Sequence, residues 1–225
     1  MTDQDCCLIV LAKEPVSGQV KKRLSAEVGQ ENAAALYKAF LKDTYTLADF
    51  LPVHFRILAY ESFGGIPKYL YSTFPHFVFY PQHGEDSGAR IQDTVMYARH
   101  LGAERIVIIG SDSPTLPSAL ISESFERLKK TDIILGPSRD GGIYLLGIKR
   151  LEPDILKELP WGTDKVSERI KENAAAAGCS LYEMCTWYDI DQLTDLKQLR
   201  RQGPSSRARA TSALFEEMEK EITKD

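Results

Sequence analysis

The sequence predicts an α/β protein in which helices cover a central sheet. Two observations lead to this prediction. Apolar runs alternate along the chain with segments whose apolar residues recur at helical spacing, a pattern typical of layered α/β folds. The first apolar run, Cys6–Ala12, is uninterrupted, as expected of a strand that is covered on both faces.

The amino-terminal half is expected to alternate regularly between strands and helices. A loop with Pro15 and Gly18 follows the first strand, and a helix is predicted from about Gln30 to Ala48. The other elements predicted in this half are strands over Val53–Tyr60, Phe77–Tyr80 and Arg105–Ile109, and helices over Gly88–Leu101 and Pro117–Lys129.

The carboxy-terminal half begins with two predicted strands, Asp132–Gly136 and Ile143–Ile148, which flank a tight glycine turn. A helix from Asp164 to about Ala177 and a strand near Ser180–Cys185 follow. The last predicted helix spans about Ser206–Thr223, and the residues expected to face inward are Ala210, Leu214, Met218 and Ile222. We expect a single domain over residues 1–225, in which 204–225 form a C-terminal helical extension, because no repeat or long linker divides the chain.

Composition excludes several classes of protein. The chain has 225 residues, of which 43% are hydrophobic and 27% charged, as in ordinary globular proteins. A net charge of −4 argues against a dedicated nucleic-acid binder. No apolar run is long enough for a membrane span, and the N-terminus lacks the basic region of a signal peptide, so we expect a cytoplasmic protein. The sequence leaves the oligomeric state open.

The first candidate site follows the first strand. Lys13 ends that strand, Gly18 lies in the loop, and three consecutive bases, Lys21, Lys22 and Arg23, come next. A polyphosphate requires both a close backbone approach, which glycine permits, and several fixed positive charges. The loop is not a Walker A motif, and a solvated basic turn before a helix is an equally good interpretation of the cluster alone.

Three further candidates also lie near predicted strand ends, where open α/β sheets bind ligands. Asp112 follows the strand that ends at Ile109, and its carboxylate suits Mg²⁺ or Mn²⁺ or, alternatively, a helix cap. Asp140 precedes two glycines in a segment that is also typical of a plain hairpin turn. Asp189 and Asp191 are two residues apart, so on a strand their carboxylates would share one face and could reach one ion, although surface acids would give the same pattern.

Five segments in order, AKEPVSGQVKKRL, IGSDSPTLP, GPSRDGGIYLLGI, LPWGTDKV and YDIDQLTDL, resemble the DUF2064 family, also described as selenodomain-associated transferase 1. The resemblance covers about residues 7 to 200. This family is similar to nucleotide-diphospho-sugar transferases of the GT-A type and to small nucleotidyltransferases. The resemblance implies a Rossmann-like GT-A fold: a three-layer α/β/α sandwich with a mostly parallel sheet.

The resemblance also implies roles for individual residues. Asp112 would hold a divalent cation, Mg²⁺ or Mn²⁺, and Asp191, with Asp189 as a further candidate, would supply a second carboxylate. The residues implied to bind the nucleotide are Ala12, Lys13, Gly18, Lys21, Arg23, Arg90 and Ser111. The residues implied to line the sugar or acceptor side are Asp140, Gly141, Gly142, Trp161 and Thr163.

The function expected from this set is a metal-dependent transferase that uses a nucleotide-activated sugar. Lys13 and Arg23 would stabilise the departing phosphate, and Asp140 would act as the acceptor base. A small nucleotidyltransferase, which joins a nucleoside triphosphate to a phosphorylated metabolite and releases pyrophosphate, is the first alternative. A non-catalytic nucleotide-binding module is the second. The partners are therefore a nucleotide sugar or nucleoside triphosphate and a small acceptor.

Overall fold

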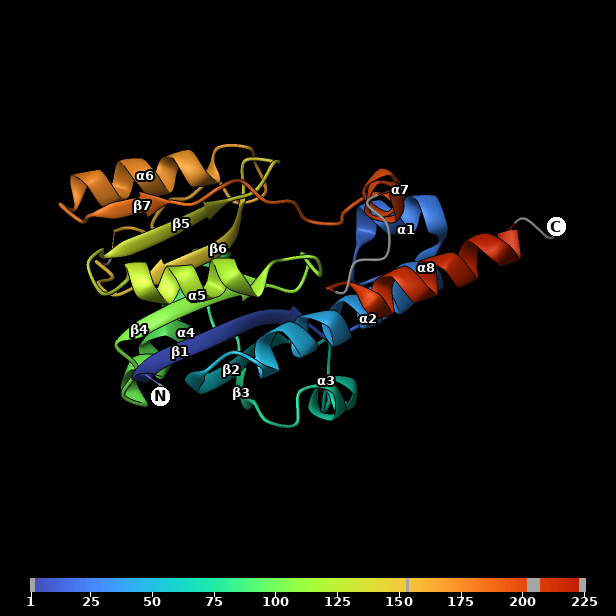
Figure 1. The fold of residues 1–225 in the computed structure, drawn as a ribbon, viewed down its shortest axis with the longest axis horizontal. Helices are drawn as coiled ribbons and strands as arrows, with labels where there is room; N and C mark the ends of the chain where they lie inside the picture. The colour runs from blue at the N-terminus through green and yellow to red at the C-terminus, as the bar shows by residue number, and fades with distance from the viewer. Residues whose placement is uncertain (1–2, 153, 202–206, 223–225) are drawn as a thin grey trace.

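A computed structural model describes residues 3–152, 154–201 and 207–222. Its sheet has seven strands in the order β3-β2-β1-β4-β6-β5-β7 (Figure 1). Strand β6 alone among the described strands runs antiparallel to its neighbours, so the sheet is mostly parallel, as predicted. The strands are β1 (Asp3–Lys13), β2 (Val53–Glu61), β3 (Val78–Pro81), β4 (Arg105–Gly110), β5 (Ile133–Pro137), β6 (Ile143–Ile148) and β7 (Leu181–Glu183).

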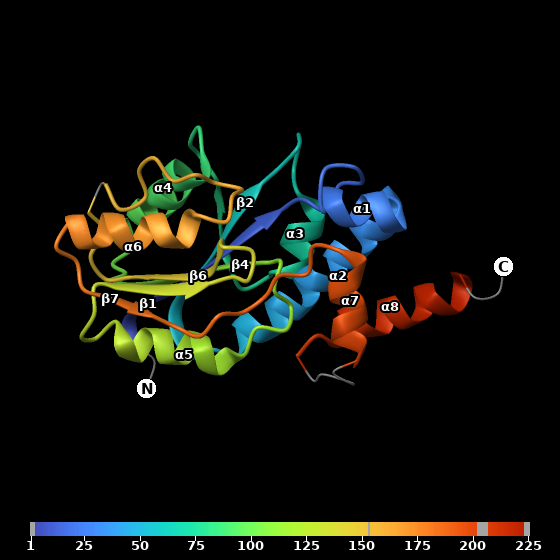
Figure 2. The same ribbon diagram turned by 90° about the horizontal axis from the view of Figure 1, so that it is seen from above.

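Helices cover both faces of this sheet, which confirms the predicted three-layer α/β/α class. Figure 2 shows α4 and α6 on one face and α2 and α5 on the other. The helices are α1 (Lys22–Val28), α2 (Gln30–Asp49), α3 (Lys68–Thr73), α4 (Ser87–His100), α5 (Ser118–Arg127), α6 (Val166–Ala176), α7 (Leu193–Arg201) and α8 (Arg209–Ile222). No helix in the described ranges has the length and apolar character required to cross a bilayer.

The alternation of side chains along β1 separates two hydrophobic cores. Leu8 and Val10 pack into the core beneath α2 and α5, whereas Cys7 and Ile9 pack into the core beneath α4 and α6. All four side chains are fully buried, because β1 lies in the interior of the sheet with helices on both sides. This double coverage explains why the strand is uninterruptedly apolar.

Three short helices were not predicted, because each buries too little apolar surface to leave a periodic signal. Only Leu24 of α1, Leu70 of α3, and Leu196 and Leu199 of α7 are buried. Strand β7 is also shorter than the predicted Ser180–Cys185. The predicted glycine turn is a hairpin, because β5 and β6 pair antiparallel on either side of it.

Helix α8 lies beside α2 (Figures 1 and 2), and its inward face agrees with the predicted one only in part, since Met218 is buried as predicted. Thr211, Phe215 and Met218 are buried, whereas Ala210 and Leu214 are only half-buried. Three hydrogen bonds from the start of α8 to the carboxylate of Asp43 fix the rotation of the helix about its axis. The predicted inward side chain of Ile222 and residues 202–206, within the predicted extension, lie outside the described part of the chain.

Candidate active site

A cleft of about 680 Å³ opens at the carboxyl ends of β1, β2 and β4. Because these strands are mutually parallel, the residues that follow them meet at one edge of the sheet. Eight of the predicted site residues line this cleft: Ala12, Lys13, Lys21, Arg23, Arg90, Ser111, Asp112 and Asp191.

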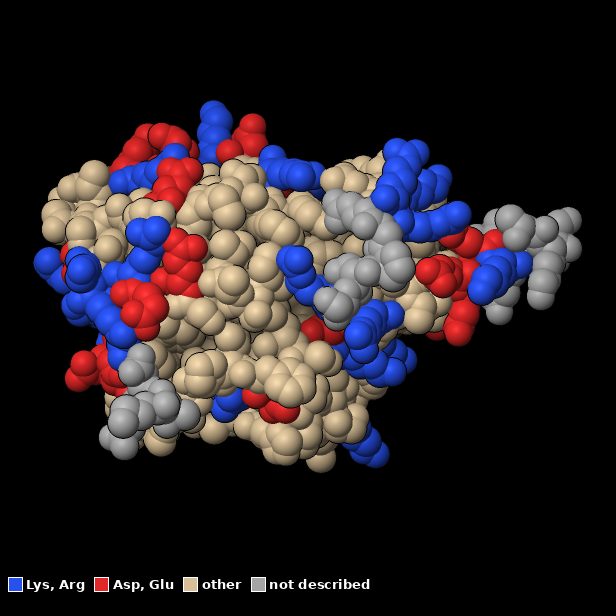
Figure 3. Space-filling view, viewed as in Figure 1, with Lys and Arg blue, Asp and Glu red and all other residues tan. Residues whose placement is uncertain are grey.

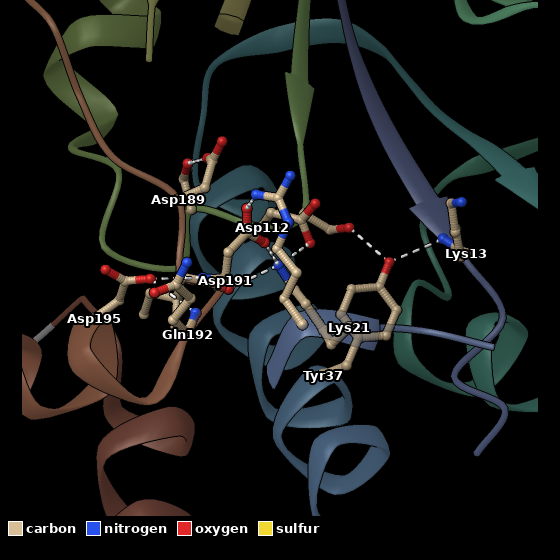
Figure 4. Close-up of polar contacts among 12 residues, drawn as sticks. Lys13, Lys21, Tyr37, Asp112, Asp189, Asp191, Gln192 and Asp195 are labelled. Carbon is tan, nitrogen blue, oxygen red and sulfur yellow. Dashed lines mark hydrogen bonds and ion pairs between the residues drawn. The ribbon is translucent and has the colours of Figure 1, made fainter. Parts of the chain in front are cut away.

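Lys21 lies at the centre of the predicted cation site (Figure 4). Its Nζ is 2.8 Å from Asp112 Oδ1 and 2.9 Å from Asp191 Oδ1, and it donates a hydrogen bond of 2.8 Å to the carbonyl oxygen of Ile190. Burial opposes the charge of this ammonium, but the two carboxylates outweigh burial and raise the pKa of Lys21 above its usual value. The ion pairs therefore bring Asp112 and Asp191 together although they lie far apart in the sequence.

The segment that carries Asp189 and Asp191 is an irregular loop, not a strand, and it lies against Asp112. The backbone N–H of Ile190 donates to the carbonyl oxygen of Asp112 over 2.9 Å. The carboxylate of Asp189 accepts a hydrogen bond from the Ser113 hydroxyl and does not line the large cleft. Burial, with the negative charge of Asp112, raises the pKa of Asp189 to about 7. Asp191, not Asp189, is therefore the carboxylate that faces the cleft beside Asp112.

Tyr37 of α2 supports the floor of the cleft and was not singled out from the sequence. Its hydroxyl accepts a hydrogen bond of 2.9 Å from the backbone N–H of Lys13 and lies 2.8 Å from the Ser111 Oγ. Burial raises the pKa of this phenol, so it stays neutral and can donate to Ser111. In the sequence, Tyr37 looks like one more residue of a buried helix face.

Glu61 was also missed, although it ends the second strand as Lys13 ends the first. Its Oε2 lies 3.2 Å from Lys13 Nζ and 3.5 Å from Arg90 Nη1, and its side chain lines the cleft. The signal that could have identified Glu61 is its position at a strand end, the criterion that selected Asp112.

A second cavity of about 240 Å³ adjoins the first. Arg23 and Asp191 line both cavities, so the two share a wall. Asp140 lines the second cavity, and its Oδ1 accepts hydrogen bonds from the Ser138 hydroxyl and, over 3.1 Å, from the backbone N–H of Gly142. The other lining residues of this cavity are Arg139, Tyr188, Asp189, Gln192 and Asp195.

The structure places the remaining predicted site residues outside both cavities. Gly141 has φ +83°, and a Cβ there would lie 2.1 Å from the carbonyl oxygen of Asp164, so this glycine shapes the hairpin. Gly142 lies in the same turn, and Gly18, with φ +75°, adjoins Gln30. These positions give the three glycines a structural role in the turns that they form.

Trp161 and Thr163 belong to the turn before α6. The half-buried Trp161 packs against the core beneath α4 and α6, and its Nε1 finds no hydrogen-bond partner among the described residues. The Thr163 hydroxyl donates to the carbonyl oxygen of Pro160 over 2.7 Å and accepts from the backbone N–H of Lys165. This placement offers no geometric support for the predicted sugar contacts of either side chain.

The donor set at the centre of the cleft fits a hard divalent cation. One oxygen of Asp112 and one of Asp191 converge on a single point, now held by an ammonium, beside a backbone carbonyl. Within the described ranges, no group of three or more His, Cys, Asp or Glu side chains surrounds a metal position. Two carboxylates leave coordination positions for phosphate oxygens, which is how Mg²⁺ is usually held beside a nucleotide.

Comparisons with known proteins identify a family and solved structures to which this chain is similar. Residues 53–163 match the sequence profile of DUF2064, described as an uncharacterized protein conserved in bacteria. A solved structure from Desulfovibrio desulfuricans G20, to which nucleotide-diphospho-sugar transferase activity is ascribed, is 30% identical with a TM-score of 0.90. That match covers 98% of this chain and 97% of the other. A search of curated proteins finds no match.

More distant solved structures share the fold alone. One is 4-diphosphocytidyl-2C-methyl-D-erythritol synthase, at 13% identity and a TM-score of 0.58, with 88% of this chain and 98% of the other covered. Another is CMP:2-keto-3-deoxy-manno-octonic acid synthetase in complex with CTP, at 11% identity and a TM-score of 0.53, with the same coverage of 88% and 98%.

Proposed function

The chain belongs to the DUF2064 family, and from that premise we propose that it is a divalent-cation-dependent transferase that uses a nucleotide-diphospho-sugar. The observation that carries this proposal is the cleft itself. It gathers Lys13, Lys21, Arg23 and Arg90 around a pair of aspartates at the edge of the sheet where such folds bind ligands. The activity ascribed to the Desulfovibrio relative agrees with this chemistry.

The order of the strands suggests how the nucleotide lies. Strands β4, β1, β2 and β3 are neighbours, about 4.8 Å apart, and their carboxyl ends present Asp112, Lys13, Glu61 and then Gln82 in a row. We place the diphosphate near Asp112 and the nucleoside roughly 10 Å away, two strands further along. Phe63, which is 39% exposed and lines that end of the cleft, offers a surface for the base.

The proposed reaction transfers a glycosyl group. An acceptor hydroxyl attacks the anomeric carbon, the bond from that carbon to the diphosphate oxygen breaks, and the nucleoside diphosphate leaves. Lys13 and Arg23 balance the negative charge that develops on the leaving phosphate, and Asp140 in the adjoining cavity takes the acceptor proton. A cation held by Asp112 and Asp191 would supply further charge neutralisation at the diphosphate.

Nucleotidyl transfer is the second candidate, favoured by the fold shared with the two synthases above. In that reaction an acceptor phosphate attacks the α-phosphorus of a nucleoside triphosphate and pyrophosphate leaves. The same basic residues and cation would then stabilise pyrophosphate.

The test is an assay of purified protein with panels of nucleotide sugars and nucleoside triphosphates, with and without Mn²⁺. We expect nucleoside diphosphate to be released from one nucleotide sugar, and release to require the cation. Release of pyrophosphate from a nucleoside triphosphate would instead establish the second candidate.

A substitution distinguishes a transferase of either kind from a protein that only binds nucleotides. We expect Asp112→Asn to reduce turnover at least 100-fold and to remove the effect of Mn²⁺ on nucleotide affinity, because one of two cation ligands loses its charge. Asp154→Asn, which removes an exposed carboxylate paired with Lys157, is the control. Unchanged nucleotide affinity and cation dependence in Asp112→Asn would indicate a binding module.

A further inference from the structure

Lys21 occupies a closed oxygen cage. An ammonium has three N–H donors, and Nζ lies within 2.9 Å of three oxygen atoms, those of Asp112, Asp191 and the Ile190 carbonyl. The side chain is only 5% exposed, whereas those of Asp112 and Asp191 are 49% and 34% exposed. The lysine therefore closes the inner side of the aspartate pair while the carboxylates still face the cleft (Figure 4).

Lys21 has an unusual backbone conformation, from which its side chain reaches the two aspartates. Lys21 precedes α1 with φ 47° and ψ 50°, a left-handed conformation that is costly for any residue with a Cβ. Its side chain makes no capping hydrogen bond to α1 and instead places Nζ 5.4 Å from the centre of the buried Phe40 ring. The ion pairs and the contact with Phe40 offset the cost of this backbone conformation.

We propose that Lys21 is a built-in counter-ion of the cation site, which must withdraw from Asp112 and Asp191 before a divalent cation can bind both. A divalent cation such as Mg²⁺ would approach the same carboxylate oxygens to about 2.1 Å, inside the space that the ammonium fills. The divalent cation and the Lys21 ammonium, in contact with the same carboxylate oxygens, would also repel each other strongly because both are positively charged. Binding of the cation to Asp112 Oδ1 and Asp191 Oδ1 and retention of the Lys21 ion pairs are therefore mutually exclusive.

The withdrawn ammonium requires another anion. Because Lys21 also lines the cleft, a phosphate of the nucleotide is positioned to accept it, and this step rests on the function proposed above. The cation should then bind weakly to the free protein and tightly together with the nucleotide. In thermodynamic terms, each ligand raises the affinity for the other because both displace the same ion pairs.

The direct test measures Mn²⁺ binding to nucleotide-free protein by calorimetry and by electron paramagnetic resonance of the free ion. We expect Lys21→Met to bind Mn²⁺ at least 10-fold more tightly than the wild type, because the aspartate pair loses the ammonium that contacts both carboxylates, while Arg23, 3.9 Å from Asp191 Oδ2, is present in both proteins. We also expect the melting temperature of Lys21→Met to be lower without metal and to rise more on addition of Mn²⁺ than that of the wild type.

Lys22→Met is the matched control, since it removes the same charge from an exposed neighbour that lines the same cleft but makes no ion pair with either aspartate among the described contacts. Its Mn²⁺ affinity should equal that of the wild type. Lys21→Gln, which retains hydrogen-bond donors without charge, provides a second neutral variant should Lys21→Met fail to fold.

Equal Mn²⁺ affinity in the folded Lys21 variant and the wild type would overturn the proposal, as would an equal gain in Lys22→Met. A separate titration of the wild type with nucleoside diphosphates tests the proposed function. If no nucleotide binds with or without Mn²⁺, the proposed function fails, whereas the nucleotide-free Mn²⁺ titration still decides the role of Lys21.

Discussion

At the scale of single residues, Tyr37 joins three segments that are remote in the sequence. Its hydroxyl links α2 to the last residue of β1 and to Ser111 after β4. These are the two strand ends that carry Lys13 and Asp112. The phenol therefore holds the end of β1 next to the segment that follows β4, on the wall of the cleft.

Tyr37→Phe should lower the free energy of unfolding by about 2 kcal/mol, because the backbone N–H of Lys13 and the buried Ser111 hydroxyl both lose a partner while the ring stays in place. Urea denaturation measures this change. Tyr69→Phe, which removes a hydroxyl bonded to the carbonyl of Lys38 at the surface, should cost less than about 0.5 kcal/mol. Equal losses in the two variants would contradict the bridging role.

Glu61 should determine whether the cleft prefers ribose to deoxyribose. Its carboxylate lies where we place the nucleoside, and a carboxylate after the second strand of such a sheet can accept hydrogen bonds from ribose hydroxyls. We expect the wild type to bind a ribonucleoside diphosphate about tenfold more tightly than its 2′-deoxy analogue, and Glu61→Gln to lose most of that preference. Calorimetry with both nucleotides measures it.

Glu14→Gln is the control for this prediction, because the Glu14 carboxylate accepts a hydrogen bond from the Phe63 backbone but does not line the cleft. Its preference should match that of the wild type. An undiminished preference in Glu61→Gln would show that Glu61 only positions Lys13 and Arg90.

At the scale of elements, an ion pair links β1 to β4 at their amino-terminal ends. Arg105 donates two hydrogen bonds, of 2.8 and 2.5 Å, to the carboxylate of Asp5. The hydrogen bonds from this guanidinium lower the pKa of Asp5 from its usual value of 3.8. The charged form of Asp5 is therefore favoured in the folded protein.

This pKa shift predicts how stability depends on pH. A carboxylate whose pKa is lowered by folding stabilises the protein fully above its unfolded pKa, and the contribution disappears as pH falls through the folded pKa. Asp5→Asn should therefore be less stable than the wild type at pH 6, and the difference should shrink below about pH 3.8. Denaturation at several pH values measures this, and a difference that grows towards acid pH would refute it.

The attachment of α8 depends on a cap supplied by another helix. The buried carboxylate of Asp43, on α2, accepts hydrogen bonds from the backbone N–H groups of Ala210 and Thr211 and from the Thr211 hydroxyl. A carboxylate at a helix N-terminus satisfies free N–H groups and interacts favourably with the helix dipole. Asp43 thus couples the start of α8 to the body of the molecule.

Asp43→Ala should lower the free energy of unfolding by about 2 kcal/mol and speed amide hydrogen exchange in α8 more than in the sheet. Mass spectrometry of exchanged peptides resolves the two regions. Lys42→Ala, next to it on the exposed side of α2, should leave the exchange of α8 unchanged. Uniform acceleration across the chain would show that Asp43 stabilises the fold globally instead.

At the scale of the whole molecule, the sequence was sufficient for the layered fold and for most strands, because burial on two faces leaves an uninterrupted apolar run. It did not indicate α1 or α7, whose few buried residues leave no such pattern. It also predicted the inward face of α8 only in part, at Met218, since the rotation of that helix is set by a carboxylate on α2. The spacing of apolar residues indicates which positions are buried. A contact such as that between Asp43 and the start of α8 depends instead on how the helices pack in the tertiary structure.

The same distinction applies to the candidate site. Lys13 and Asp112 were selected because they lie at strand ends, and both line one cleft because parallel strands end at a common edge of the sheet. Tyr37 was missed because its polar atom acts from within a buried helix face. Trp161 and Thr163, selected by resemblance alone, lie outside both cavities, where packing and a local turn account for them.

Basic and acidic side chains are interspersed on the face of the molecule seen in Figure 3, so neither sign of charge covers that whole face. The wall formed by Arg23 and Asp191 between the two cavities has a consequence for inhibitor design. Under the function proposed above, a bisubstrate compound that tethers a nucleoside diphosphate to an acceptor mimic across this wall would fill both compartments at once. The tether would supply the second half at a high effective concentration, so the compound would bind far more tightly than either half alone.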